Sequence, residues 1–366
     1  MANTKPTLTR FKDAMRQVYG SFDDLTAEEA TNWTPPETPG AGGHRGRYLW
    51  TDAFGVLNFL TLYKESGQLL YVELAKSLVR TVHDVLGRTR DGTARLPGAS
   101  NETPLKGGLR IGKVDADGRD GDGQYHHYLT LWMFALNRLA VCTGDEKFNN
   151  LAIQLAKAIH PHFVYTTVSR SLCMVWKVST DLKRVLVASE GHLDAATGYV
   201  VYSLLQRTAG RLNYSFVPHS LTTEINEYWQ MMNRKEKRTM SPSSDTLDLG
   251  MGLWMCHLAG NELWANTLGE ESLSLAHRVL NPERGFTSRA AGRRLAFREF
   301  GFCLGIQTYG RDRFLAHKVE DVLQFWNEHS ETFSDDDLGP ISSVMYAAAL
   351  KPGAFYVRPP GSRRNS

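Results

Sequence analysis

The sequence has few cysteines, an almost balanced charge and no long apolar run, and each of these absences excludes a class of protein. Its four cysteines lie far apart, so no pair has the spacing of a metal site or a redox motif. The 42 basic and 39 acidic residues leave a net charge of +3, too balanced for a nucleic-acid-binding protein with a clustered basic face. No run of about 18 apolar residues could cross a membrane. The N-terminus lacks the apolar segment of a secretory signal, so we expect a cytoplasmic protein.

What the sequence does contain is a repeated pair of helical patterns. Residues 48–63 are apolar around most of the circumference, as in a buried helix, whereas 71–85 carry charges on one side, as in an outer helix. The same pair recurs at 124–141 and 148–159, joined by a short turn. Further buried patterns lie at 194–205, 248–260, 299–309 and 337–350, and further amphipathic ones at 221–232, 263–280 and 313–329.

The N-terminal pattern at 8–19 would supply a sixth outer helix and close a ring. Alternating buried and amphipathic helices with short turns predict an all-α protein, an (α/α)6 barrel of six helical hairpins. We expect one domain over 1–350 and a partly disordered tail at 351–366. The long connections precede the buried helices and would gather at one barrel mouth, where 174–187 predicts a small β-hairpin.

Acidic residues mark the starts of the buried helices. An acid followed closely by glycine opens five of them, and Asp122-Gly123 lies just ahead of the sixth. Each acid could simply cap a helix. In a barrel, however, they would face one cavity, where one carboxyl could protonate a glycosidic oxygen and another activate water. We therefore predict Asp52 and Asp122 as the first catalytic pair, with Asp194 and Asp248 next.

Aromatic and basic residues gather in the same segments. Flat rings stack on sugar faces, and a guanidinium group binds a carboxylate in a planar fork, so an anionic substrate is one option. The alternative is that each arginine pairs with a neighbouring acid. The predicted substrate-binding residues are Arg45, Arg47, Tyr48, Trp50, Tyr125, His126, His127, Trp176, Lys177, Arg298 and Glu299.

The sequence predicts no metal and no organic cofactor. The segment 115–123 is similar to a calcium loop but has Asp120 where that loop needs glycine. His126 and His127 are adjacent, so on a helix their side chains point about 100° apart, which disfavours a shared metal ion. Neither a nucleotide-binding P-loop nor a serine elbow is present.

Three segments carry a resemblance to a known family: GGHRGRYLWTDAFGVLNFLTLY, GDGQYHHYLTLWMFALNRLA and SEGHLDAATGYVVYSLL. They resemble the six-hairpin glycosidase superfamily of (α/α)6 toroids, in a mainly fungal branch, over roughly 40–350. That superfamily includes glycoside hydrolases, unsaturated glucuronyl hydrolases, sugar 2-epimerases and phosphorylases. In the glucuronyl hydrolases an aspartate near an early inner helix is the acid, and Asp52 and Asp122 occupy comparable places. In the epimerases inner-helix histidines transfer protons, which His126, His127 and His257 match in residue type.

Three functions follow from these observations. The first is a carbohydrate-active hydrolase that cleaves a glycosidic or unsaturated uronic-acid sugar with paired carboxylates. The second is an isomerase or lyase on the same barrel, either similar to sugar 2-epimerases or acting on a non-sugar ligand of secondary metabolism. The third is a non-catalytic binding protein. The expected partner is a small molecule or an oligosaccharide, not nucleic acid or a membrane.

Overall fold

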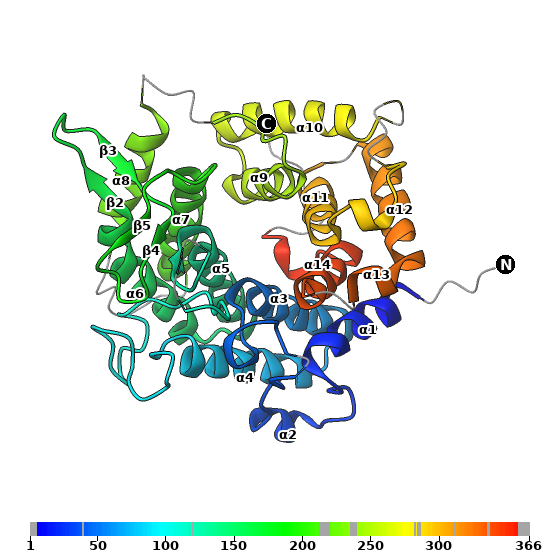
Figure 1. The fold of residues 1–366 in the computed structure, drawn as a ribbon, viewed down its shortest axis with the longest axis horizontal. Helices are drawn as coiled ribbons and strands as arrows, with labels where there is room; N and C mark the ends of the chain where they lie inside the picture. Colours follow the sequence, from blue (N-terminus) through cyan, green and yellow to red (C-terminus); the bar gives the residue numbers. More distant parts are fainter. Residues whose placement is uncertain are drawn as a thin grey trace. The chain divides into compact units, whose positions relative to one another are not determined.

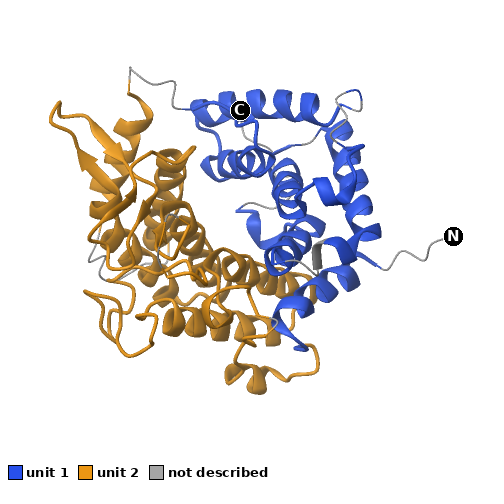
Figure 2. Ribbon diagram, viewed as in Figure 1, with its two compact units in different colours: residues 1–22, 240–366 blue, residues 23–239 orange. Residues whose placement is uncertain are grey.

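The computed structural model describes residues 6–38, 40–116, 118, 120–211, 220–234, 240–281, 283, 287–310, 312–334 and 337–357. They fall into two compact units (Figure 2). Unit 1 comprises residues 1–22 and 240–366, and unit 2 comprises residues 23–239. The predicted single domain over 1–350 spans both units. No helix among the described residues is long and apolar enough to cross a membrane.

Unit 2 contains three hairpins of one buried and one amphipathic helix (Figure 1). The buried helices are α3 (Leu49–Ser66), α5 (His126–Thr143) and α7 (Asp194–Arg211). Their partners are α4 (Leu70–Val85), α6 (Glu146–Phe163) and α8 (Thr222–Met232). Left-handed glycines, Gly67 after α3 and Gly144 after α5, end both helices because glycine adopts this conformation without a Cβ clash. A short helix, α2 (Ala27–Thr31), packs against α4.

Unit 1 contains the remaining predicted helices. They are α1 (Thr7–Tyr19), α9 (Thr246–Ala259), α10 (Leu263–Val279), α11 (Ala296–Tyr309), α12 (Arg313–Glu328) and α14 (Gly339–Leu350). A short helix that the sequence did not predict, α13 (Ser330–Ser334), lies between α12 and α14. The backbones of α9 and α11 approach closely at glycines, because a Cβ on Gly305 would lie 2.0 Å from the Gly250 carbonyl oxygen. As the sequence predicts, the N-terminal helix α1 packs against α14, where Ser343 donates a 2.7 Å hydrogen bond to Gln17.

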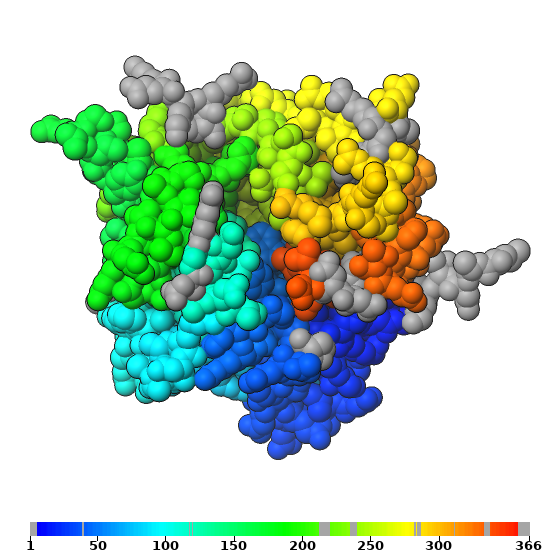
Figure 3. Space-filling view, viewed as in Figure 1, coloured from blue at the N-terminus to red at the C-terminus, as the bar shows by residue number. Residues whose placement is uncertain are grey.

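Two small antiparallel sheets lie within the described part of unit 2. The first has the strand order β1 (Gln124–Tyr125), β4 (Lys177–Val178), β5 (Val185–Val187), so the predicted hairpin at 174–187 is β4–β5. The second pairs β2 (Val164–Thr166) with β3 (Leu172–Met174), and this hairpin projects from the surface of unit 2 (Figure 3). Strand β1 of the first sheet ends directly before α5, so this sheet lies beside the start of that helix.

Short 3-10 helices complete the described elements, at His44–Gly46 (η1), Ala291–Arg293 (η3) and Gly353–Phe355 (η4). Part of the predicted tail is therefore ordered. The Phe355 side chain is buried, and its carbonyl accepts a 3.3 Å hydrogen bond from Trp254. Residues 358–366, where the sequence predicts disorder, lie outside the described residues.

Candidate functional site

The first predicted catalytic pair, Asp52 and Asp122, is buried against arginines. Asp52 lies in the first turn of α3, and its Oδ1 accepts a 2.9 Å hydrogen bond from Arg47, whose side chain is equally buried. Arg47 also donates to the Pro36 carbonyl at 2.7 Å. Asp52 Oδ2 accepts no hydrogen bond from the described residues, but the side chain has no exposed surface through which a ligand could reach it. This is the arginine-pairing arrangement that the sequence left open as the alternative.

Asp122 is held by four donors. Its Oδ2 accepts from Arg110 at 2.6 Å and from Arg90 at 2.8 Å. Its Oδ1 accepts from the backbone N–H groups of Gly112 and Gly123, both at 3.0 Å. A carboxylate has about four acceptor positions. All of them are used here, so Asp122 ties together the connection between α4 and α5 and offers no free lone pair to a ligand.

Three predicted site residues lie in unit 1. Glu299 is buried, accepts a 2.8 Å hydrogen bond from Arg294 Nε, and also accepts one of 2.8 Å from the Trp326 indole. Asp248 is exposed at the start of α9, and Arg298 forms a partly exposed ion pair with Asp245. Arg298 is therefore engaged within the protein, like the arginines that hold Asp52 and Asp122.

In unit 2, six ring systems come together into an aromatic cluster, and five of them belong to the predicted site. We define the cluster as Tyr48, Trp50, Tyr125, His127, Tyr128 and Trp176. The Trp50 ring lies 5.1 Å from Tyr128 and 6.0 Å from His127, centre to centre. Tyr125 lies 4.9 Å from Trp176. The His127 side chain is 37% exposed. Rings around a reachable imidazole are a suitable surface for a sugar or another flat ligand.

The small sheet positions this cluster. Tyr125 pairs with Lys177 across β1 and β4, and the His126 N–H donates a 3.0 Å hydrogen bond to the Trp176 carbonyl. The buried Lys177 ammonium lies 5.0 Å from the Tyr125 ring centre and donates to the Gly121 carbonyl at 3.0 Å. Burial lowers the pKa of Lys177. The buried Lys177 therefore packs against the Tyr125 ring of the cluster.

Arg45, another predicted substrate-binding residue, is held outside the cluster. Its guanidinium group donates a 3.1 Å hydrogen bond to the Asp91 carbonyl in the connection between α4 and α5. Its backbone has φ of 53°, in the left-handed region, within the short helix η1. Arg45 therefore links η1 to the connection between α4 and α5.

Two tyrosine hydroxyls of the cluster form a hydrogen bond with each other. Tyr48 Oη and Tyr128 Oη are 2.7 Å apart. Burial raises the pKa of Tyr48, and it raises the pKa of Tyr128 well above its usual value. Both hydroxyls therefore stay protonated at neutral pH, and one hydrogen of the pair can be donated to an oxygen of a bound ligand.

Asp194, the first residue of α7, lies beside the histidines that begin α5. Its Oδ1 is 3.9 Å from His126 Nδ1 and 4.0 Å from His127 Nδ1. Its Oδ2 is buried and accepts no hydrogen bond from the described residues. Buried carboxylate oxygens are normally satisfied. Asp194 thus differs from Asp122 in its remaining acceptor capacity, and from Asp52 in lying beside a reachable imidazole.

The turn before α7 is built around the Asp194 carboxylate. A Cβ on Gly191 would lie 2.1 Å from Asp194 Oδ2, so a larger residue there would displace the carboxylate. Leu193 has φ of 59°, a left-handed conformation that is uncommon for leucine. Strained backbone of this kind persists where surrounding structure imposes it, and it is concentrated at functional sites.

His126 is fully buried, in contrast to His127. Its Nε2 forms a 2.7 Å hydrogen bond with the hydroxyl of Tyr228 on α8, and its Nδ1 has no hydrogen-bond partner among the described residues. A Cβ on Gly198 would lie 2.5 Å from Tyr228 Cζ, so this glycine lets the ring approach α7. The predicted substrate-binding residue His126 therefore lies behind the aromatic cluster.

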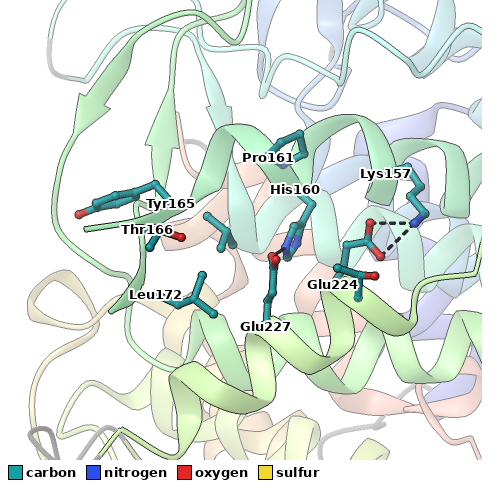
Figure 4. Close-up of a pocket in the computed structure, with 10 residues that line it drawn as sticks. Lys157, His160, Pro161, Tyr165, Thr166, Leu172, Glu224 and Glu227 are labelled. Atoms are coloured by element: carbon teal, nitrogen blue, oxygen red, sulfur yellow. Dashed lines mark hydrogen bonds and ion pairs between the residues drawn. The ribbon is translucent and has the colours of Figure 1, made fainter. Parts of the chain in front are cut away.

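A separate cavity of about 370 Å³ lies between α6, α8 and the β2–β3 hairpin (Figure 4). Its two glutamates pair with a lysine and a histidine across the two helices. Lys157 donates to Glu224 at 2.8 Å, and His160 bonds Glu227 at 2.7 Å. Burial lowers the pKa of His160. The simplest role of these two pairs is to fasten α8 to α6.

No group of three or more potential metal ligands comes together within the part of the chain that the structure describes. The four cysteines are free thiols; Cys256 and Cys303 are buried, while Cys142 and Cys173 are half-buried.

Comparison with solved structures identifies the fold. A sugar epimerase from a ruminal bacterium is 13% identical, with a TM-score of 0.55, over 94% of this chain and 99% of that one. Cellobiose 2-epimerase from Spirochaeta thermophila is 12% identical, with a TM-score of 0.53, over 97% and 98%. Cellobiose 2-epimerase from Bacillus thermoamylovorans is 10% identical, with a TM-score of 0.52, over 88% of each chain. These likenesses confirm the predicted (α/α)6 fold class.

No family model matches the sequence, and no curated protein matches it either. The fold is therefore the only property that the comparisons establish.

Three residues that shape the site were not predicted: Arg90, Tyr228 and Gly191. Arg90 is 32 residues from its partner Asp122, and Tyr228 is 102 residues from its partner His126. No local sequence pattern predicts such contacts. Gly191 stands three residues before Asp194, and this short spacing is the one signal that could have indicated a tight turn around the carboxylate.

Proposed function

We propose that this protein is an isomerase that acts on a sugar by proton transfer, with the aromatic cluster as the sugar site and His127 as the acid–base group. The observation that carries the proposal is the position of His127: an accessible imidazole in contact with four aromatic rings, 4.0 Å from a buried carboxylate. The likeness in fold to sugar epimerases supports the same class of reaction.

The chemistry needs one base beside an acidic C–H bond. In an open-chain aldose, the C2 hydrogen lies next to the C1 carbonyl. His127 takes this proton, the C–H electron pair moves into the C1–C2 bond, and the carbonyl oxygen gains the charge of an enediolate. The enediolate then turns its other face to His127, the imidazolium returns the proton to C2 on that face, and the C1 carbonyl re-forms, so the epimer is produced with no atom gained or lost.

The surrounding groups fit this sequence of steps. The Asp194 carboxylate faces the imidazolium that forms on His127 and stabilises its charge. The Tyr48–Tyr128 pair retains a hydroxyl hydrogen for the enediolate oxygen. The half-buried Trp176 supplies a flat apolar surface in the same cluster.

Glycoside hydrolysis finds less support among these residues. It needs two carboxyls placed on either side of the scissile bond. Asp122 has all its acceptor positions used, and Asp52 is fully buried with one oxygen bound to Arg47. Asp194, by contrast, lies beside the accessible imidazole of His127, which favours chemistry based on histidine.

The test is a panel of reducing sugars and disaccharides followed by NMR for C2 epimers. We expect a 2-epimer of at least one sugar, and His127→Asn should lower its rate by about 10²–10⁴-fold, the usual contribution of an acid–base group. His162→Asn, an exposed histidine on α6, is the control and should keep full activity. Cleavage of glycosidic bonds without epimerisation, or full activity of His127→Asn, would overturn the proposal.

A further inference from the structure

A line of three buried side chains runs away from His127 behind the aromatic cluster. Asp194 on α7 faces His126 at the start of α5, and His126 is bonded to Tyr228 on α8 (Figure 1 shows these helices). All three are buried, with exposed fractions of 3% for Asp194 and 0% for the other two. Asp194 is the member of this line whose side chain faces His127, at 4.0 Å, so Tyr228 can influence the site through its neighbours.

From this geometry we infer that Tyr228 is a positioning residue. It selects the tautomer of His126 whose Nδ1–H faces the Asp194 carboxylate, and this carboxylate in turn faces His127. The inference rests on the proposed function, because it assigns a role in the same site. Tyr228 and His126 do not touch the sugar.

The hydrogen bond of 2.7 Å between Tyr228 Oη and His126 Nε2 links the Tyr228 hydroxyl to the tautomer of the imidazole. Burial raises the pKa of Tyr228 well above its usual value, so the hydroxyl keeps its hydrogen at neutral pH. When that hydrogen is donated to Nε2, the single proton of a neutral imidazole must be on Nδ1.

The other side of the same imidazole faces Asp194. His126 Nδ1 is 3.9 Å from Asp194 Oδ1, which is too long for a hydrogen bond. Because both side chains are buried, the carboxylate charge and the dipole of the imidazole still interact at this distance. An N–H directed at a carboxylate is favourable, whereas a bare nitrogen lone pair there would be repelled. Tyr228 therefore selects the tautomer that stabilises an anionic Asp194.

Packing keeps this arrangement in place. The Tyr228 ring lies 5.7 Å from the His126 ring, 4.8 Å from His160 and 5.2 Å from Tyr202, all edge to face. Gly198 on α7 provides the room, since a Cβ at this position would meet the ring. The titratable groups that face Tyr228 are thus His126, His160 and Tyr202, with Asp194 and Glu224 acting on it by charge.

The test compares Tyr228→Phe with Tyr71→Phe, which removes a hydroxyl from an equally buried tyrosine on α4. Loss of one hydrogen bond to His126 should lower kcat by about tenfold in Tyr228→Phe, with KM within about twofold because Tyr228 does not touch the sugar. Tyr71→Phe should change neither kcat nor KM.

A measurement that does not need activity keeps the two proposals separable. Nitrogen NMR of the His126 ring should show the proton on Nδ1 in the wild type and a mixture of tautomers in Tyr228→Phe. A wild type with the proton on Nε2, or a tautomer unchanged by Tyr228→Phe, overturns the inference even if the protein epimerises sugars. An inactive wild type with the expected NMR result would overturn the proposed function and support the tautomer selection by Tyr228.

Discussion

Asp122 and Asp194 are equally hidden from solvent, at 3% exposure each, yet their surroundings differ in kind. Asp122 accepts four hydrogen bonds, two from guanidinium groups and two from backbone N–H groups. Asp194 has two imidazoles at about 4 Å, and its Oδ2 accepts no hydrogen bond from the described residues. Burial alone therefore does not identify a catalytic carboxyl. The acceptor positions already in use, together with the groups alongside, separate a structural acid from one that can take part in chemistry.

The largest expected effect on stability comes from Asp122. Asp122→Asn removes the charge that balances Arg90 and Arg110, and breaking a buried pair from one side costs about 3–5 kcal/mol. Chemical denaturation measures the loss. The matched control is Asp120→Asn, an exposed acid of the same connection, with an expected change within about 0.5 kcal/mol. An Asp122→Asn protein as stable as the wild type would show that the two aspartates do not differ as described.

An effect of intermediate size on stability is expected from His83 on α4, a buried imidazole whose Nε2 accepts a hydrogen bond. Trp132 donates a 3.1 Å hydrogen bond to His83 Nε2, and burial, followed by the charge of Arg95, lowers the pKa of His83 to about 3. The unfolded chain therefore binds a proton here that the folded protein does not. The resulting stability is complete above about pH 6.5 and is lost as the pH falls toward 3.

His83→Gln should remove this pH dependence, because glutamine can accept the same hydrogen bond without titrating. At pH 5 the wild type should have lost about 2 kcal/mol through His83, and the variant should not. Unfolding free energies at pH 7 and pH 5 give the comparison, with the exposed His162→Gln as control. Parallel pH profiles for the wild type and His83→Gln would contradict a neutral buried imidazole.

The smallest effect is expected at Arg298, a predicted ligand whose ion pair lies at the surface. Arg298 and Asp245 are 38% and 33% exposed, so solvent screens their attraction. Arg298→Ala should change the unfolding free energy by less than about 1 kcal/mol. A loss as large as that of Asp122→Asn in the same denaturation experiment would mean that exposure does not explain the difference between the two pairs.

The fold could be predicted from the sequence far more completely than the site. Helix periodicity is a local property, so the pattern at 71–85 became α4 (Leu70–Val85) and that at 313–329 became α12 (Arg313–Glu328). The five-residue helices α2 and α13 were missed because each is too short to show a period. The aromatic cluster was largely predictable, since five of its members lie in the short segments 48–50 and 125–128.

Partners distant in the sequence could not be predicted in the same way. The acids at the helix starts were recognised, but whether an arginine or a histidine faces each one depends on contacts such as Arg90 with Asp122 and Tyr228 with His126. Those contacts are set by packing between helices and connections, not by any pattern along one segment. Our proposal of isomerisation in place of hydrolysis rests on these same contacts.

The most direct test of the proposed reaction is the epimerisation of a reducing sugar in deuterium oxide, followed by NMR of the product at C2. The imidazole of His127 is accessible and exchanges its proton with solvent, so we predict deuterium at C2 of the epimer and about 10²–10⁴-fold slower formation of this product by His127→Asn. An epimer that keeps its original hydrogen in full, or a sugar that is cleaved and not epimerised, would contradict it.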